Sequence, residues 1–269
     1  MPFFRMIVFP NCKINLGLHI IRKRTDGFHD LETVFYPLQL TDALEVLSPG
    51  TLQFHSSGID IPGAAADNLC LKAWHLLKKD FPFIPEVDIH LHKHIPIGAG
   101  LGGGSADAAF MLVHLNQRFQ LELTKEQMLA YAAMLGSDCP FFILNRACYA
   151  TGRGEVMEPL ELDLKGCTIV LVYPGIHVNT GWAFKQLTPR EPEVSLKEVI
   201  KRPLEEWKGL MKNDFEIPIF EAHPELAAIK EEMYQQGSVY ATMSGSGSAM
   251  VGIFPEGGKF KTDYKSFII

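Results

Sequence analysis

The chain has 269 residues, which is enough for one large domain or two domains of modest size. Hydrophobic residues make up 47% of it and charged residues 21%, an ordinary balance that allows an apolar core. The net charge of -6 and the lack of a Lys- or Arg-rich run argue against nucleic-acid binding, and no apolar stretch reaches the roughly 20 residues of a membrane span.

The cysteines indicate a reducing compartment. Their number is odd and no two form a Cys-x-x-Cys pair, so the pattern favours reduced thiols over a disulfide framework or a zinc site. The apolar start, Met1–Pro10, is too short for a signal peptide. We therefore expect a cytoplasmic protein. The cysteines are Cys12, Cys70, Cys139, Cys148 and Cys167.

Residues 7–21 are expected to form two strands around a turn at Pro10-Asn11-Cys12. Lys13 lies between apolar neighbours, so its ammonium group should lie near a strand end and point into a cleft. From composition alone, an ordinary strand lysine that extends its charge to water is the favoured interpretation. Asp26-Gly27 then predicts a turn. Further strands are expected at 33–40, 43–48 and 51–56.

A helix capped by Asn68 and running to about Lys79 is expected next. Residues 87–93 alternate between apolar and polar side chains, which is typical of a strand. His90, His92 and His94 then share one face. Successive side chains on one face lie about 6–7 Å apart along a strand, so solvated histidines are favoured over a metal site.

A glycine-rich loop follows this strand, with five glycines in the seven positions 98–104. Apolar residues then recur at helical spacing through a helix expected at about 105–117. A loop that enters a helix N-terminus in this way favours phosphate binding. A flexible linker would not run into an amphipathic helix, no lysine of a Walker loop follows, and the match of Gly98–Gly103 to a dinucleotide fingerprint is weak by itself.

Thr124–Gln127 predicts a capping box, and Gly136 should end the helix that this box opens. Asp138 follows, and on residue type alone an N-cap with Pro140 just inside the helix is as good an interpretation as a functional carboxylate. The two are compatible, because a cap would anchor the carboxylate. A turn at Gly152-Arg153-Gly154 places the domain boundary, giving domains at 1–152 and 153–269.

The second half is expected to hold a buried strand at 169–173 and a helix opened by Asn179 or Thr180. A loop with one short helix is expected at 188–205, a helix at about 206–213, and a helix from His223-Pro224 that Gly237 ends. Two strands, at 239–243 and 249–254, flank the small-residue loop 244–248, which allows close approach of the backbone to a ligand.

Five segments, in order along nearly the whole chain, resemble motifs of the GHMP kinases, the family that includes galactokinase, homoserine kinase and mevalonate kinase. The glycine-rich loop resembles the motif that wraps the triphosphate of ATP in this family. Asp26-Gly27-Phe28-His29 is similar to one branch, whose substrate is a diphosphocytidyl methylerythritol. The segments are Lys13–Leu16, Arg24–Leu31, Pro96–Ala109, Gly136–Phe142 and Met243–Ser248.

The resemblance implies a two-domain α+β fold, with ATP and substrate in the cleft between the domains. It implies an ATP-dependent kinase that phosphorylates the 2-hydroxyl group of the diphosphocytidyl substrate in the non-mevalonate pathway of isoprenoid biosynthesis. Mg²⁺ would be held mainly by phosphate oxygens. The expected partners are small molecules only, with no nucleic acid and no membrane, and we expect a monomer or a weak homodimer.

The resemblance also implies roles for single residues. Asp138 matches the catalytic aspartate that accepts the hydroxyl proton, Lys13 matches the catalytic lysine, and Ser105 is a candidate Mg²⁺ ligand. Positions that contact the substrate are matched by Asn15, Phe28, His29, Thr180 and Phe184, with His29 on the cytosine and the two Phe rings beside it. Positions that contact ATP are matched by Asn68, Lys93, Pro96, Ile97, Gly98, Ala99, Gly100, Leu101, Gly102, Gly103, Gly104, Ser105 and Ala106.

Two departures from the family and two rival interpretations remain. Many relatives carry Tyr in place of Phe28, and Ala106-Asp107 stands where relatives vary, but neither departure is expected to touch the chemistry.

Another GHMP kinase, such as a homoserine or mevalonate kinase, would explain the glycine loop but not Asp26–His29. A non-catalytic protein of the same fold would lack the lysine or the aspartate, and this chain has both Lys13 and Asp138.

Overall fold

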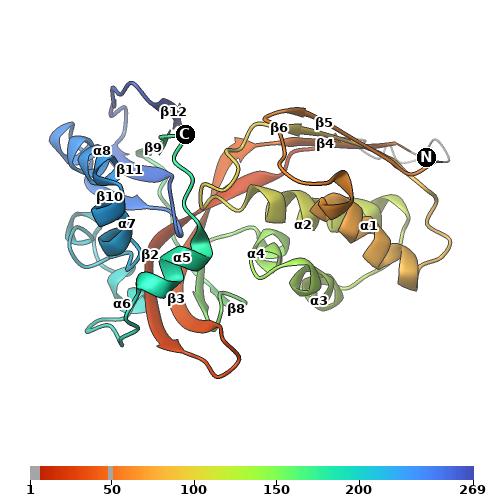
Figure 1. The fold of residues 1–269 in the computed structure, drawn as a ribbon, viewed down its shortest axis with the longest axis horizontal. Coiled ribbons are helices and arrows are strands. Elements are labelled where there is room, and N and C mark those ends of the chain that lie inside the picture. Colours follow the sequence, from red (N-terminus) through yellow and green to blue (C-terminus); the bar gives the residue numbers. More distant parts are fainter. Residues whose placement is uncertain (1–6, 48–50) are drawn as a thin grey trace. The chain divides into compact units, whose positions relative to one another are not determined.

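The computed structural model describes residues 7–47 and 51–269; the first six residues and residue 48 of the strand expected at 43–48 lie outside them. The chain forms two compact units (Figure 1), neither of which is one continuous segment. Unit 1 holds the residues up to Cys12 together with 39–97 and 102–145, and unit 2 holds 13–38, 98–101 and 146–269. The glycine loop is thus divided between the units, and the domain boundary expected at residue 152 stays a prediction.

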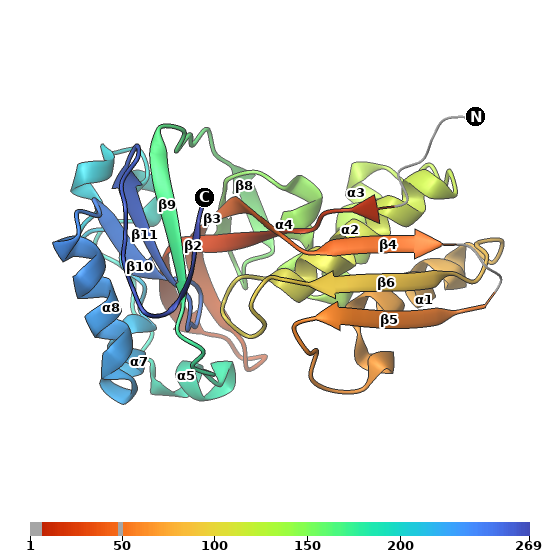
Figure 2. The ribbon, with the colours of Figure 1, turned by 90° about the horizontal axis from the view of Figure 1, so that it is seen from above.

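Unit 1 is a four-stranded sheet with helices packed on one face, as Figures 1 and 2 show. The strand order is β1-β4-β6-β5, in which β5 and β6 run parallel and the other pairs antiparallel. Its elements are β1 (Ile7–Val8), β4 (Ala43–Leu47), β5 (Gln53–Gly58), η1 (Ala65–Asp67), α1 (Leu69–Asp80), β6 (Asp88–Lys93), α2 (Gly103–Arg118), α3 (Lys125–Leu135) and α4 (Cys139–Leu144).

The alternation expected in the strand that enters the glycine loop is confirmed in β6. Ile89 and Leu91 are buried against the helices together with residues of α1 and α2 such as Leu77 and Leu112. The intervening residues, His90 among them, lie on the other face of the sheet, which no helix of the described part covers in Figure 2. Burying one face of a sheet under two helices produces the apolar core of unit 1.

The predicted caps of two helices of unit 1, α1 and α3, are confirmed. Asn68 caps α1 by accepting a hydrogen bond from the backbone N–H of Cys70 at 2.9 Å. Thr124 and Gln127 form the capping box of α3, which Gly136 ends. Each cap satisfies N–H groups that a helix start leaves unpaired. These ends depend on neighbours in the sequence, which is why the sequence alone located them.

Unit 2 contains two four-stranded sheets, with strand orders β2-β3-β7-β8 and β10-β11-β9-β12. Its apolar core packs α7 and α8 against the second sheet, with Met233, Ala241 and Phe254 among the buried residues. Its elements are β2 (Asn11–Lys23), β3 (His29–Thr41), β7 (Cys148–Thr151), β8 (Val156–Pro159), β9 (Cys167–Tyr173), α5 (Thr180–Gln186), α6 (Leu196–Val199), η2 (Leu204–Glu206), α7 (Glu216–Ala222), α8 (Pro224–Gln235), β10 (Tyr240–Met243), β11 (Met250–Pro255) and β12 (Lys265–Ile268).

One element expected in unit 2 is absent from the described residues, and the observed elements include two that were not expected. The helix expected at 206–213 is wrong: after η2 the chain makes turns, and Gly209 has a φ of +84°, which a right-handed helix does not allow. Helix α7 was missed, since Pro218 stands within its seven residues and reads as a break. Strand β12 was also missed, because its four residues form a strand through pairing with β9.

Candidate active site

Three glycines of the loop adopt a left-handed backbone conformation, with φ of 68° at Gly98, 79° at Gly100 and 69° at Gly102. At Gly100 the restriction is also one of space, because a Cβ atom there would lie 2.0 Å from the backbone oxygen of Ser244. No other residue type avoids both penalties. The glycines therefore shape the loop and bring its backbone close to residues 244–248.

Helix α2 begins at Gly103, two residues earlier than expected. Its N-cap is Gly102, which has no side chain to accept from the N–H groups of the first turn. A Cβ atom on Gly104 would meet nothing within 4 Å. The start of this 16-residue helix thus presents backbone N–H groups and the positive end of a helix dipole, an arrangement that favours an anion such as phosphate.

The loop between β10 and β11 supports the first half of the glycine loop within unit 2. The hydroxyl of Ser244 donates to the backbone oxygen of Gly100 at 2.9 Å and accepts from the backbone N–H of Asn15 at 3.2 Å. The backbone N–H of Ala249 donates to Ala99 at 3.1 Å. Two glycine motifs far apart in the sequence are therefore one hydrogen-bonded structure.

Sequence reasoning missed Asn213, which holds this second loop in place. Its side-chain amide donates to the backbone oxygens of Met243 at 2.7 Å and Gly245 at 2.8 Å, and it is only 2% exposed. An amide group that satisfies two buried carbonyls fixes the path of the backbone between them. Nothing near Asn213 in the sequence signals this role, because its partners lie about thirty positions further along.

Lys13 is 4% exposed, so the interpretation as a lysine that extends its charge to water is wrong. Its Nζ donates to Oδ1 of Asn15 at 2.7 Å and lies 4.6 Å from the centroid of the Phe35 ring. Nδ2 of Asn15 donates in turn to the Thr33 hydroxyl at 2.8 Å. This chain of contacts across β2 and β3 orients the ammonium group and restricts its motion. Thr33 and Phe35 were not anticipated from the sequence.

Asp138 occupies the N-cap position of α4, with Pro140 in the first turn, as expected. Its side chain, however, makes no capping hydrogen bond, so the idea that a cap anchors the carboxylate is wrong. The next residue, Cys139, is hydrogen-bonded to Ser105 in the first turn of α2, and burial raises the pKa of its thiol to about 11. Within unit 1, the start of α4 therefore lies beside the start of the phosphate-loop helix.

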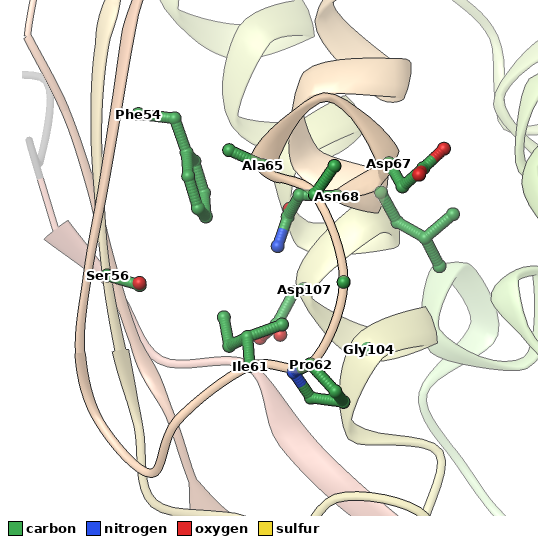
Figure 3. Close-up of a pocket in the computed structure, with 12 residues that line it drawn as sticks. Phe54, Ser56, Ile61, Pro62, Ala65, Asp67, Asn68, Gly104 and Asp107 are labelled. Carbon is green, nitrogen blue, oxygen red and sulfur yellow. The ribbon is translucent and has the colours of Figure 1, made fainter.

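A cavity of about 300 Å³ opens beside the start of α2 within unit 1 (Figure 3). The Phe54 ring and the Asn68 amide face the same space from different elements. Because Oδ1 of Asn68 accepts the capping hydrogen bond, its amide nitrogen is the atom directed into the cavity. The lining combines apolar walls with a few polar groups, which is typical of a small-molecule pocket. It consists of Phe54, Ser56, Ile61, Pro62, Gly63, Ala64, Ala65, Asp67, Asn68, Leu69, Gly104 and Asp107.

Lys93 does not line this cavity. It is 3% exposed and forms a buried ion-pair cluster with Asp42 and with Asp107, whose Oδ2 lies 2.7 Å from the lysine Nζ. Asp107 contacts Lys93 and also lines the cavity. The expectation that the Ala106-Asp107 departure does not touch the chemistry stays a prediction. The sequence offered no signal for Asp42, because it stands 51 positions before Lys93.

The electrostatics of Asp107 differ from those of an ordinary carboxylate. Burial raises its pKa to about 7, with the negative charge of Asp42 adding to the rise and Lys93 opposing it. Its Oδ1 is buried and has no hydrogen-bond partner within residues 7–47 and 51–269. A carboxyl group with one unsatisfied oxygen at a cavity wall is suited to bind a ligand donor.

The aromatic residues expected at a substrate site lie together in unit 2. The His29 and Phe184 rings stack with centroids 4.9 Å apart, and burial lowers the pKa of His29. Phe28 is 52% exposed, with the Arg153 guanidinium 4.9 Å from its ring centroid. The Thr180 hydroxyl lies 3.0 Å from the hydroxyl of Ser246, in the supporting loop. Unit 2 thus presents exposed and part-buried rings beside the loop that holds the glycines.

Comparison with known proteins bears on both halves of the chain. Residues 68–146 match the GHMP kinases N terminal domain, and residues 195–263 match the GHMP kinases C terminal domain. A protein of Bacteroides thetaiotaomicron named 4-diphosphocytidyl-2-C-methyl-D-erythritol kinase is 53% identical over 264 residues, which cover 96% of each chain. A protein of the same name from Chlorobium phaeobacteroides is 41% identical, over 91% of this chain and 87% of the other.

Solved structures agree in fold. The crystal structure of a 4-(cytidine 5'-diphospho)-2C-methyl-D-erythritol kinase superposes with a TM-score of 0.80 at 33% identity, covering 92% of this chain and 90% of the other. The mevalonate kinase of Methanococcus jannaschii superposes with a TM-score of 0.71 at 14% identity, over 100% and 98% of the two chains. The second likeness concerns the fold alone. Within the described residues, no helix is long and apolar enough to cross a membrane.

Proposed function

The chain belongs to the 4-diphosphocytidyl-2-C-methyl-D-erythritol kinases of the GHMP kinase family, and we propose from this premise that it transfers the γ-phosphate of ATP to the 2-hydroxyl group of that diphosphocytidyl alcohol. The observation that carries the proposal is the 53% identity with a kinase of this name over 96% of both chains. The reaction belongs to the non-mevalonate route of isoprenoid biosynthesis, in which this protein acts in the cytoplasm on small molecules, as a monomer or a weak homodimer.

The nucleotide binds along the glycine loop and in the cavity of unit 1. Backbone N–H groups at the start of α2 receive the phosphates, since they point outward from a cap that has no side chain. The adenosine enters the cavity beside Gly104, where the apolar wall of Phe54 and Ile61 accepts a flat ring. The amide nitrogen of Asn68 donates to a ring nitrogen. Lys93 does not contact the nucleotide directly; it orients Asp107, which lines the cavity, through their ion pair.

Phosphoryl transfer asks the protein to position groups and to stabilise charge. Asp138 accepts the proton of the attacking hydroxyl group. The hydroxyl oxygen bonds to the γ-phosphorus as the bond from this phosphorus to the β-phosphate oxygen breaks, and ADP leaves. Lys13 stabilises negative charge on the transferring group. Its ammonium group is suited to this role because Asn15 and the Phe35 ring orient it, so little reorganisation is needed during the reaction.

Mg²⁺, when bound, would supply positive charge that neutralises the phosphates of ATP. Of the residues in the loop, Ser105 offers a hydroxyl oxygen in the first turn of α2, a hard donor of the kind that Mg²⁺ prefers. Its hydrogen bond to Cys139 orients that hydroxyl. Ser105 is therefore the protein ligand that we assign, and the phosphates and water supply the rest.

The cytidine group binds to the aromatic residues of unit 2. Phe28 offers an exposed ring face for stacking. His29, stacked on Phe184, directs ring nitrogens to the cytosine edge, and its lowered pKa keeps the imidazole neutral at physiological pH. Thr180 and Asn15 supply further polar contacts to the substrate. Phe28 lacks the hydroxyl that Tyr would supply, so stacking carries the recognition at that position.

An ADP-release assay with ATP and Mg²⁺ tests the proposal. Turnover should occur with 4-diphosphocytidyl-2-C-methyl-D-erythritol and not with homoserine or mevalonate. Asp138→Asn should lower kcat by at least about 100-fold, because general-base contributions are of about that size, while Asp163→Asn, at an exposed carboxylate, should leave kcat unchanged. Turnover with mevalonate or homoserine instead would contradict the substrate, and full activity of Asp138→Asn would contradict the base.

A further inference from the structure

His92 of β6 is exposed, in agreement with the expectation of solvated histidines, whereas His90 has a carboxylate and a second imidazole beside it. His90 has its Nε2 at 3.0 Å from Oδ2 of Asp88, two positions away on the same strand. His55, on the neighbouring strand β5, has its Nε2 at 3.3 Å from the other carboxylate oxygen, Oδ1. The two imidazole rings stack with centroids 4.7 Å apart. One carboxylate thus faces two imidazole nitrogens that come from two strands.

The pairing register of the sheet explains why these residues meet. His55 is the direct partner of His90 in the parallel β5–β6 pair, and directly paired residues project on the same face. Residues 88 and 90 share that face because side chains alternate along a strand. It is the face of the unit 1 sheet opposite α1 and α2. The site is therefore separated from the cavity by the thickness of the sheet.

The ligand atoms are already spaced for a small cation. The three donor atoms, one from each residue, lie within 4.8 Å of one another. Nε2 of His90 lies 3.0 Å from Oδ2 of Asp88, and Nε2 of His55 lies 3.3 Å from Oδ1 of the same carboxylate. Two ligands of a tetrahedral Zn²⁺ at about 2.0–2.1 Å would be roughly 3.3 Å apart.

A second observation points to a missing partner. Oδ1 of Asp88 is buried, and within the described residues no donor makes a hydrogen bond to it; the approach of His55 at 3.3 Å is an ion-pair contact only. A buried carboxylate oxygen without a donor is costly, and a metal ion would satisfy it. Nε2 of His55 also lies 3.3 Å from Oε1 of Gln53, which places a further oxygen at the same edge.

We propose that His55, Asp88 and His90 form a binding site for a divalent transition-metal ion, with Zn²⁺ as the favoured occupant and water in its fourth position. Two imidazoles and one carboxylate suit Zn²⁺ better than Mg²⁺, which prefers oxygen ligands only. The ion would join the edge strand β5 to β6. Because Phe54 and Ser56 flank His55 on β5 and line the cavity, the ion would also hold that wall of the cavity in place.

Cobalt substitution of the untagged, nucleotide-free protein tests the site, since Co²⁺ reports its coordination through visible absorption. Titration with Co²⁺ should give tetrahedral d–d bands that saturate at one ion per chain, and Zn²⁺ should displace the ion and abolish the bands. His55→Ala should weaken Co²⁺ binding at least about tenfold, by the loss of one ligand. His92→Ala is the matched control, because His92 lies two positions along the same face and bonds to Ser57 instead.

Three results would overturn the proposal. No visible band on titration would mean that the cluster is only an ion pair between histidine and aspartate. A thiolate charge-transfer band in the near ultraviolet would assign the ion to cysteine. Bands that survive in His55→Ala, or that are lost equally in His92→Ala, would place the ion elsewhere. Circular dichroism of both variants distinguishes the loss of a ligand from the loss of the fold.

Discussion

Asp107 illustrates how a single residue combines stability with a ligand site. Two carboxylates, Asp42 and Asp107, share the one cation Lys93 in a buried cluster. One negative charge is left over, which burial makes costly, and the pKa of Asp107 rises to about 7 from its ordinary value of 3.8. The carboxyl group of Asp107 therefore exchanges its proton near physiological pH.

The sign of the resulting pH dependence follows from this rise. Between pH 3.8 and about 7 the folded chain holds the Asp107 proton and the unfolded chain has lost it. Folding stability contributed by this group is therefore present below pH 3.8 and is lost as the pH rises toward 7. Asp107→Asn, which cannot ionise, should remove that loss.

We therefore expect Asp107→Asn to raise Tm relative to wild type at pH 8, by about 2–4 °C for each kcal/mol of repulsion relieved in a chain of this size, and to have a smaller effect at pH 5. Thermal unfolding of both proteins at the two pH values measures this difference in Tm. The other titrating groups are the same in both proteins, so their contributions cancel in the difference. An identical shift at pH 5 and pH 8 would show that Asp107 does not titrate in this window.

At the scale of elements, the glycine loop has its shape because another loop supports it. Residues 98–101 bond to loop 244–248, which Asn213 holds through two backbone oxygens. Conformational freedom of the glycines could be inferred from residue type. The contacts between residues 98–101 and residues 244–249 could not, since they join segments more than a hundred residues apart. The sequence reasoning also failed for the helix expected at 206–213, where Gly209 has a left-handed φ.

Asn213→Asp is expected to disrupt this support with little change in volume. A carboxylate cannot donate to the carbonyls of Met243 and Gly245, so two buried acceptors lose their partner at about 1–3 kcal/mol each. Urea unfolding should show the lost stability, and the KM for ATP should rise as the glycine loop loosens. Lys212→Ala, at the exposed neighbouring position, serves as the control and should match wild type. If Asn213→Asp is destabilised but its KM for ATP is unchanged, the support that Asn213 gives to the glycine loop does not contribute to ATP binding.

At the scale of the whole molecule, the chain divides its apolar residues between two cores. One packs helices α1 and α2 on the unit 1 sheet, and the other packs α7 and α8 on the second sheet of unit 2. The buried cluster around Lys93 belongs wholly to unit 1. Disruption of that cluster should therefore destabilise unit 1 more than unit 2.

Lys93→Met tests this expectation. It leaves two buried carboxylates without a cation, which should cost about 3–5 kcal/mol. Hydrogen exchange measured by mass spectrometry should show faster exchange in β6 and α2, while β9–β11 of unit 2 stay protected. Lys165→Met, at a surface lysine with a 90% exposed side chain, should change neither. Equal loss of protection in both units would mean that the molecule unfolds as a single cooperative body.

The sequence by itself determined what depends on neighbouring residues: the caps of α1 and α3, the alternation of β6 and the motifs that mark the kinase family. It also supplied the candidate residues for ATP and substrate, which stay a prediction. Only the tertiary structure decided the partners of Lys93, the support of the glycine loop by Asn213, and the meeting of His55 with Asp88 and His90. Local elements follow from short-range sterics and hydrogen bonds, which a pattern encodes, whereas buried charges and paired strands depend on contacts between distant segments, which no local pattern encodes.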